Sequence, residues 1–293
     1  MPILRSPVQL GFALILAMTA ITSASAAPPP LIALFSDYGW QDSYVAQLKG
    51  VIATDAPNAR FTDLTHAVTP FNVDEGAYLL DQCAAEFPKG TIFLAVVDPQ
   101  VGTERASIIL ETKAGKFYVG PDNGLFTLVV DRERFSRAWT LDKPEYFRPG
   151  TTSHTFHGRD IFAPIAARLA TGTDPDKLGS PLKTLSLLPI KQPTFSNGTI
   201  SVEVLHTDRY GNVILNFPKD HELSAKLKEG NLIKVQIGKQ NFSGPLVKTY
   251  GDIDKGRLIL LYGGNGLLEI AKNQGSAAKE LKVEPGTVIF LKP

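Results

Sequence analysis

The sequence predicts an α/β N-terminal domain with a mostly parallel sheet, followed by a smaller all-β C-terminal domain, a barrel or a sandwich. In the first part of the chain, apolar runs alternate with stretches of helical periodicity, as in parallel sheets. Beyond about residue 190, short alternating runs are separated by turn residues, as in antiparallel domains. The 293 residues are 43% hydrophobic, enough for two modest cores. The predicted domains are residues 27–190 and 191–293.

The strands predicted in the N-terminal domain are continuous apolar runs, which suit strands buried on both faces. They cover residues 31–35, 60–64 and 91–97, with a hairpin at 107–111 and 116–119. Helices are predicted at 42–54, 74–87 and 160–170, where Val45, Leu48 and Ile52 would share one face. Asp160 is expected to cap the last of these helices.

A linker is predicted at residues 180–197, which hold three prolines and little periodicity. The C-terminal strands are predicted at 199–205, 213–217, 232–237, 242–250, 257–261 and 288–291.

Residues 1–26 are predicted to be a secretory signal peptide. A basic start precedes a short apolar stretch and the small residues Ala24, Ser25 and Ala26.

One cysteine, Cys83, cannot form an internal disulfide, which favours export to a bacterial periplasm. No later apolar run is long enough to span a membrane, so no membrane association is expected after cleavage. Cleavage removes one Arg and lowers the net charge from +1 to 0, which gives no sign of a nucleic-acid partner.

Polar residues follow several predicted strands, where an open parallel sheet binds its ligands. Asp37 ends the first strand and Asp42 follows it, while Asp98 ends the strand at 91–97. The turn at 120–124 and the loop at 155–160 would complete one crevice. For any single Asp after a strand, a turn or a helix cap is the commoner role. Four such polar segments at the same edge of the sheet favour a ligand-binding or catalytic site.

Asp98, Arg105 and His157 are the predicted centre of this site. Asp98 follows an apolar strand and needs a partner, and Arg105 comes seven residues later. A paired Asp and Arg beside a neutral His can hold and polarise a water molecule. Two alternatives remain: a salt bridge that pins a loop, and a structural histidine. Asp122 and Asn123 are expected to form a turn that supports the site.

A metal site would draw on the clustered acids and histidines, namely Asp37, Asp42, Asp98, Asp122, His66 and His157. The spacings of known zinc and calcium motifs are missing, and Arg105 and Arg159 beside these acids disfavour a cation. We therefore predict no metal, with a metal-dependent hydrolase as an alternative.

Taken together, the motifs resemble those of the S-adenosylmethionine hydrolase family (adenosine-forming, or hydroxide adenosyltransferases), which is related to the S-adenosylmethionine-dependent fluorinase and chlorinase. The motifs occur in one order across nearly the whole mature chain. They are Ser36-Asp37-Tyr38-Gly39, Asp63-Leu64-Thr65-His66, Val97-Asp98-Pro99 with Gly102 and Arg105, Gly120-Pro121-Asp122-Asn123-Gly124, Thr155-Phe156-His157-Gly158-Arg159-Asp160, Asp208 with Tyr210-Gly211-Asn212, and Leu268-Glu269-Ile270-Ala271 with Asn273.

The resemblance implies that water displaces methionine at C5′ of S-adenosylmethionine, giving adenosine and methionine without a cofactor. It implies that Asp98 and His157 orient and deprotonate the water and that Arg105 favours its hydroxide form. Substrate-binding roles are implied for Asp37, for Asp42 (at the ribose hydroxyls), for Phe71 (packing near the ribose), and for Asp208, Tyr210 and Asn212 (at the methionine end). A homotrimer with sites at subunit interfaces is also implied.

The related halogenases lack the charged trio, and a carboxylate at Asp98 would repel a halide, so the resemblance favours a hydrolase. A halogenase and a periplasmic nucleoside-binding protein without turnover remain the alternatives. The chain departs from the family at Gln100, where Gly is common, and at Tyr262-Gly263-Gly264-Asn265-Gly266, which replaces a Ser-rich turn.

Overall fold

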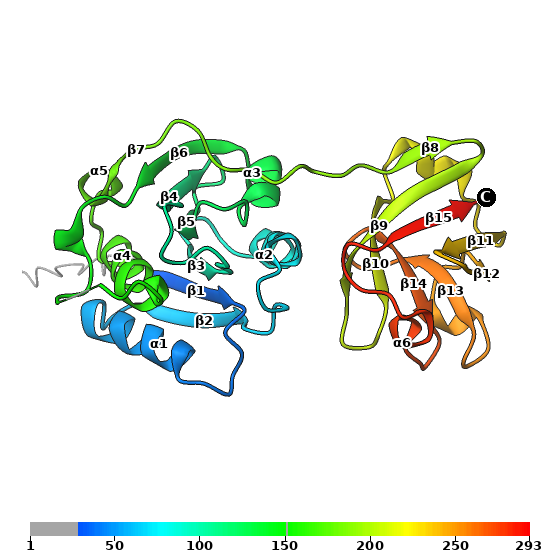
Figure 1. The fold of residues 1–293 in the computed structure, drawn as a ribbon, viewed down its shortest axis with the longest axis horizontal. Coiled ribbons are helices and arrows are strands. Elements are labelled where there is room, and N and C mark those ends of the chain that lie inside the picture. The colour runs from blue at the N-terminus through cyan, green and yellow to red at the C-terminus, as the bar shows by residue number, and fades with distance from the viewer. Residues whose placement is uncertain (1–28, 151) are drawn as a thin grey trace, which may run out of the picture.

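A computed structural model describes residues 29–150 and 152–293, which form two lobes joined by an extended segment (Figure 1). The predicted signal peptide lies outside the described residues. No helix in the described part of the chain is long and apolar enough to cross a membrane.

The N-terminal lobe is built on a seven-stranded mixed sheet in the order β2-β1-β3-β5-β4-β6-β7. The strands β2, β1, β3 and β5 run parallel, and β4, β6 and β7 add antiparallel pairs at one edge. The predicted mostly parallel sheet and the β4–β5 hairpin are confirmed. The bounds are β1 Leu31–Ser36, β2 Arg60–Thr65, β3 Ile92–Val96, β4 Ser107–Thr112, β5 Phe117–Pro121, β6 Phe135–Thr140 and β7 Ser180–Pro181.

Helices cover both faces of this sheet, which explains the continuous apolar strands (Figure 1). Ile32 and Leu34 of β1 pack with the side of α1 and α4, whereas Ala33 and Phe35 pack with the side of α2 and α3. The helices are α1 Tyr44–Asp55, α2 Val73–Ala85, α3 Thr127–Glu133, α4 Ala163–Ala170 and α5 Pro175–Leu178. The predicted inward residues Val45, Leu48 and Ile52 are buried on α1.

Two elements of this lobe, α3 and β6, were not predicted from the sequence. Helix α3 is only seven residues long, and β6 has three exposed residues followed by two buried ones, so it lacks the alternation of a half-buried strand. The prediction that Asp160 caps a helix is wrong. The helical segment begins earlier with a π-helical turn, Gly158–Phe162, and Asp160 lies buried inside it. There its carboxylate is ion-paired with Arg159 at 2.7 Å and accepts the backbone N–H of Ser153 at 2.8 Å, so its charge is already satisfied.

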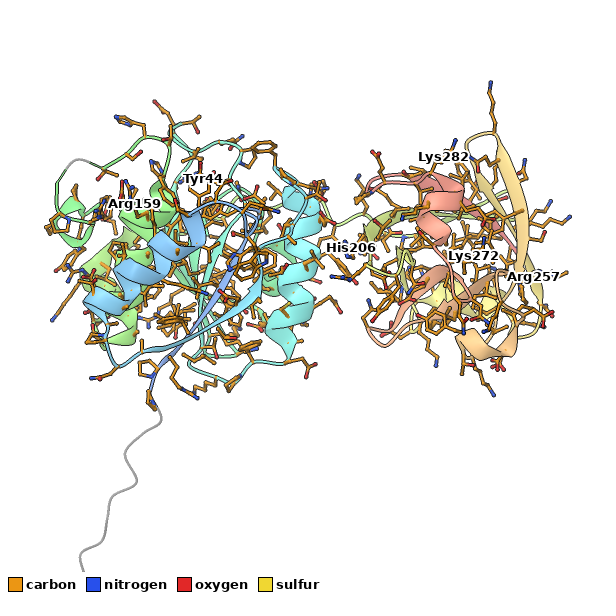
Figure 2. The ribbon with its side chains drawn as sticks, turned by 90° about the horizontal axis from the view of Figure 1, so that it is seen from below. Tyr44, Arg159, His206, Arg257, Lys272 and Lys282 are labelled. Atoms are coloured by element: carbon orange, nitrogen blue, oxygen red, sulfur yellow. The ribbon has the colours of Figure 1, made fainter. Side chains whose placement is uncertain are left out.

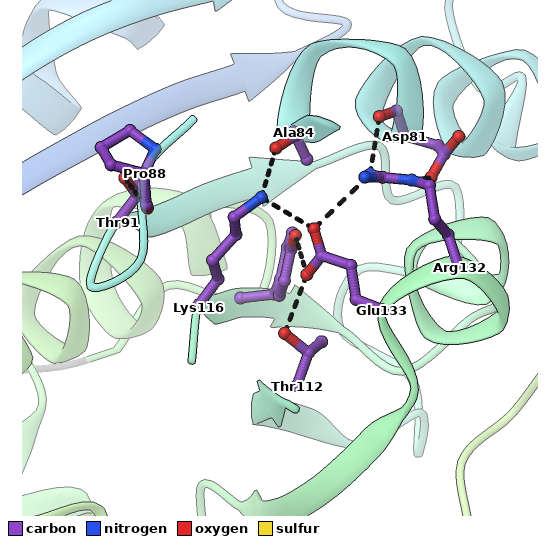
Figure 3. A network of polar contacts seen from close by, with 9 residues as sticks. Asp81, Ala84, Pro88, Thr91, Thr112, Lys116, Arg132 and Glu133 are labelled. Carbon is purple, nitrogen blue, oxygen red and sulfur yellow. Dashed lines mark hydrogen bonds and ion pairs between the residues drawn. The ribbon is translucent and has the colours of Figure 1, made fainter. Parts of the chain in front are cut away.

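A buried polar network ties α3 to the sheet (Figure 3). The Lys116 ammonium donates to Glu133 at 2.9 Å and to the carbonyl of Ala84 at 2.6 Å. The other Glu133 oxygen accepts from Thr112 at 2.8 Å and from Tyr118 at 2.9 Å. Every charge in this cluster has a partner, as burial requires.

The C-terminal lobe is an antiparallel sheet that curls into a nearly closed barrel, in the order β12-β11-β15-β9-β10-β14-β13 with β8 beside β9. A bridge between Leu246 and Leu260 brings the two edges together. Strand β14 and the short helix α6 Ala277–Leu281 were not predicted. The strands are β8 Thr194–Ser196, β9 Thr199–Thr207, β10 Val213–Pro218, β11 Leu232–Ile237, β12 Gln240–Pro245, β13 Leu258–Tyr262, β14 Leu267–Lys272 and β15 Val288–Lys292.

Polar contacts join the two lobes directly. His206 of β9 lies 2.6 Å from the buried carboxylate of Glu75 in α2, and Asn265 donates to the Tyr78 hydroxyl at 2.6 Å. In Figure 2, His206 lies at the junction of the lobes. Between β7 and β8 the chain runs without helix or strand over residues 182–193.

Candidate active site

Asp98, Arg105 and His157 meet beyond the carboxyl end of the parallel strands. Asp98 follows β3, Arg105 precedes β4, and His157 directly precedes the π-helical turn. The Arg105 Nε donates to Asp98 Oδ1 at 2.9 Å, and Nη2 donates to both the second Asp98 oxygen and His157 Nδ1, the latter at 2.9 Å. Asp98 and Arg105 each expose 4% of their side chains. The trio predicted from the sequence is therefore one connected group, not three separate residues.

This geometry fixes the tautomer of His157. A guanidinium has no acceptor, so Nδ1 must accept and the ring proton of a neutral imidazole must be on Nε2. Burial lowers the pKa of His157, and the nearby charge of Arg105 lowers it further. His157 is thus a neutral ring that offers an N–H donor at Nε2.

Arg105 is held by two further acceptors that the sequence did not indicate. Its Nη1 donates to Ser107 Oγ at 2.8 Å and to the carbonyl of Ala106 at 3.3 Å. Its guanidinium also lies 5.5 Å from the centre of the buried Phe162 ring. The cation therefore has one fixed position, and it fixes the orientation of Asp98 in turn.

A glycine contact holds together the loops that carry the trio. Gly102 has φ +81°, and a Cβ placed on it would overlap the carbonyl oxygen of His154. The loop of Asp98 and Arg105 therefore packs directly against the loop of His157. Gln100 fits this loop, because the left-handed conformation belongs to Gly102 and the Gln100 carbonyl accepts from Thr103.

Asp37 lies at the same edge of the sheet. Burial raises the pKa of Asp37, and the charge of Asp98 adds to the increase. Asp37 Oδ2 accepts the backbone N–H of Phe71 at 2.9 Å, and Phe71 has φ +68° with a side chain 72% exposed. A non-glycine residue in this conformation is uncommon. Asp42 is exposed in the turn before α1.

Behind Asp37, a chain of hydrogen bonds runs through His66, which the sequence had raised as a possible metal ligand. His66 Nδ1 lies 2.7 Å from Ser36 Oγ, and Nε2 lies 3.0 Å from Asp63. The two ring nitrogens are thereby occupied within the protein. Asp122, another candidate ligand, accepts from Ser186, and Asn123 donates to the Val97 carbonyl at 2.9 Å. Among residues 29–150 and 152–293, no group of three or more His, Cys, Asp or Glu is placed to hold a metal.

Asp208, Tyr210 and Asn212 form a tight turn between β9 and β10 in the other lobe. Asp208 Oδ1 accepts from the backbone N–H groups of Tyr210 at 2.9 Å and Asn212 at 2.8 Å, and Oδ2 accepts from Asn212 Nδ2 at 2.8 Å. Tyr210 is 78% exposed. No hydrogen bond in the described chain joins this turn to the trio.

Comparison with known proteins decides the family. The model of the SAM hydroxide adenosyltransferase N-terminal domain matches residues 32–179, and that of the C-terminal domain matches residues 202–290. The chain belongs to this family.

Members of the family with a named activity are similar over most of the chain. The (R)-S-adenosyl-L-methionine hydrolase of Thermus thermophilus is 38% identical over 265 residues, which cover 87% of this chain and 97% of that protein. A fluorinase of Actinoplanes is more distant, at 27% identity over 89% of this chain and 96% of its own length. The fold also matches a crystal structure of an uncharacterized conserved protein from Thermotoga maritima, with a TM-score of 0.84, 36% identity, and coverage of 89% of this chain and 100% of that chain.

Proposed function

We propose that this protein is an enzyme that hydrolyses S-adenosyl-L-methionine to adenosine and L-methionine. The observation that carries the proposal is the connected Asp98–Arg105–His157 group in a chain that is 38% identical to a protein named for that activity. A buried ion pair whose guanidinium is fully hydrogen-bonded, with a neutral histidine at its side, is suited to hold one water molecule.

In the proposed reaction, water attacks C5′ in line with the bond to sulfur. The O–C5′ bond forms, the C5′–S bond breaks, and sulfur keeps the electron pair as the thioether of methionine. The sulfonium needs no protonation to leave, so the protein must orient the water and take one proton. Orientation of this kind supplies roughly 7–11 kcal/mol.

The tautomer of His157 determines which residue of the trio orients the water and which accepts its proton. Because Nδ1 accepts from Arg105, the N–H at Nε2 is the group available to orient the oxygen of the water. The carboxylate of Asp98 keeps free lone pairs beside its two bonds from Arg105 and is the proton acceptor. His157 is therefore assigned to orientation, and deprotonation to Asp98.

Substrate binding is assigned to residues around this centre. Asp42 is retained as a ribose ligand, and the contact of Asp37 with Phe71 adds Asp37 as a second carboxylate at the same sugar. The exposed turn of Asp208, Tyr210 and Asn212 is assigned to the methionine end of a substrate bound by a neighbouring subunit, in a homotrimer. We also propose export to the periplasm, on the strength of the sequence of residues 1–26.

The test is incubation with S-adenosylmethionine in ¹⁸O-labelled water, with chromatography and mass spectrometry of the products. We expect adenosine that carries the label in its 5′-hydroxyl. Asp98→Asn should lower the rate by roughly 10²–10⁴-fold, the usual contribution of a positioned base. Asp131→Asn is the matched control, since the Asp131 side chain is 60% exposed and pairs with the exposed Arg134 outside the site.

Each alternative gives a different result. Binding of adenosine without turnover would replace the proposal with a nucleoside-binding protein. A 5′-halogenated nucleoside formed in fluoride or chloride would replace it with a halogenase. Equal activity in the Asp98→Asn and Asp131→Asn variants would exclude the assigned role of Asp98.

A further inference from the structure

Tyr38 lies just beyond the end of β1, with a ring that neighbouring aromatic residues hold in place. The ring centroid lies 5.6 Å from that of Tyr44 and 5.9 Å from that of Phe156. Tyr38 also packs against the hydrophobic cluster on the α1 and α4 side of the sheet. Because the ring is fixed, its hydroxyl has a defined position.

The hydroxyl of Tyr38 lies against the backbone that carries His157. A Cβ built on Gly158, the residue after His157, would be 2.5 Å from the Tyr38 hydroxyl oxygen. The hydroxyl makes no hydrogen bond to any residue of the described chain. Its oxygen is nevertheless not completely buried. A water molecule can therefore reach it beside Gly158.

The charges of the site also act on the Tyr38 hydroxyl. Burial raises the pKa of Tyr38, the charges of Asp37 and Asp98 raise it further, and Arg105 opposes them. The phenol therefore stays protonated at neutral pH, with one donor and two acceptor positions. None of these positions is used by the described protein, so a ligand or a water molecule is their natural partner.

We propose that Tyr38 is a fourth catalytic residue, whose hydroxyl binds the attacking water from the side of Gly158. This inference rests on the proposed hydrolysis. When the O–C5′ bond forms, one hydrogen of the water passes to Asp98 and the other stays on the oxygen as the 5′-hydroxyl of adenosine. The phenol oxygen accepts a hydrogen bond from that second hydrogen, while His157 Nε2–H donates to the water oxygen. Tyr38 thus fixes the hydrogen that is not transferred and aims the remaining lone pair at C5′.

The first experiment compares Tyr38→Phe with Tyr146→Phe. The control residue packs against the same hydrophobic cluster, but its ring lies 5.2 Å from Arg168. We expect Tyr38→Phe to lower kcat about tenfold with little change in KM, the rate equivalent of one lost hydrogen bond. Tyr146→Phe should leave both constants unchanged. Wild-type kcat in Tyr38→Phe would overturn the inference alone, whereas a wild-type protein without turnover would overturn the proposed function as well.

A double-mutant cycle keeps the test independent of general stability. Gly158→Ala places a methyl group 2.5 Å from the hydroxyl oxygen but 3.4 Å from the ring carbon that bears it, which is ordinary contact. We expect Gly158→Ala to lower kcat in the wild-type background and to have little further effect in the Tyr38→Phe background. Equal fold-losses in both backgrounds would show that the hydroxyl is not the group that matters. Thermal unfolding of all four proteins would show that they are folded.

Discussion

Replacing Arg105 by methionine removes the cation at the centre of the site and leaves Asp98 buried without its counterion. The guanidinium makes five hydrogen bonds, two to Asp98 and one each to His157, Ser107 and Ala106. Methionine has a similar length and keeps the contact with Phe162. The substitution therefore tests the charge and the hydrogen bonds more than the packing.

The expected cost follows from burial. Both side chains of the ion pair are only 4% exposed, so solvent cannot replace the lost partner. Breaking such a pair from one side costs about 3–5 kcal/mol in the free energy of unfolding. The turnover rate should also fall, by roughly 10²–10³-fold, as when one fixed donor is removed from an active site.

Urea denaturation followed by circular dichroism measures the first quantity, and adenosine formation measures the second. Arg134→Met is the control, because Arg134 is 71% exposed and lies 3.6 Å from an exposed Asp131. An exposed pair of this kind is worth less than about 1 kcal/mol. If Arg105→Met and Arg134→Met lowered stability equally, the Asp98–Arg105 pair would not be the buried, tightly coupled unit described above.

Three other predictions follow from the site and the core. The activity requires neutral His157, whose pKa is lowered by burial and by Arg105, so kcat/KM should stay constant from neutral pH downwards and fall only below the ordinary histidine range; a midpoint above that range would contradict the assigned tautomer. Lys116→Met should lower the free energy of unfolding by about 3 kcal/mol, the low end of the cost of breaking a buried pair, because the buried Glu133 carboxylate then keeps only the more distant Arg132 at 3.5 Å as a cation; a melting temperature equal to that of wild type would contradict this. Exhaustive treatment with a chelator should leave adenosine formation unchanged, and a loss restored by added Zn²⁺ or Mg²⁺ would instead support a metal-dependent hydrolase.

The elements that could be predicted from the sequence are those with a uniform burial pattern. Strands β1 and β3 are buried on both faces and read as continuous apolar runs, so their positions and the polar residues after them were predictable. Asp98 and Arg105 followed from those strand ends, and the resemblance to the family added His157. The three side chains do lie together. Their catalytic roles stay predictions until the variants are measured.

Other features depend on contacts that no local pattern records. Helix α3 has only seven residues, and β6 is an antiparallel strand with three exposed residues at its start. Asp160 resembled a helix cap, yet tertiary contacts with arginines bury it inside the turn. In the sequence, Tyr38 is only the residue after Asp37 in a motif. Its hydroxyl is a functional candidate because the fold places it next to Gly158.

The contact between Gly102 and the His154 carbonyl has a consequence for engineering this scaffold. Because Gly102 touches the backbone carbonyl of His154, a side chain at position 102, or a change of length in either loop at that point, would displace the other loop. Libraries that seek a new nucleophile should therefore vary both loops together and keep Gly102 fixed.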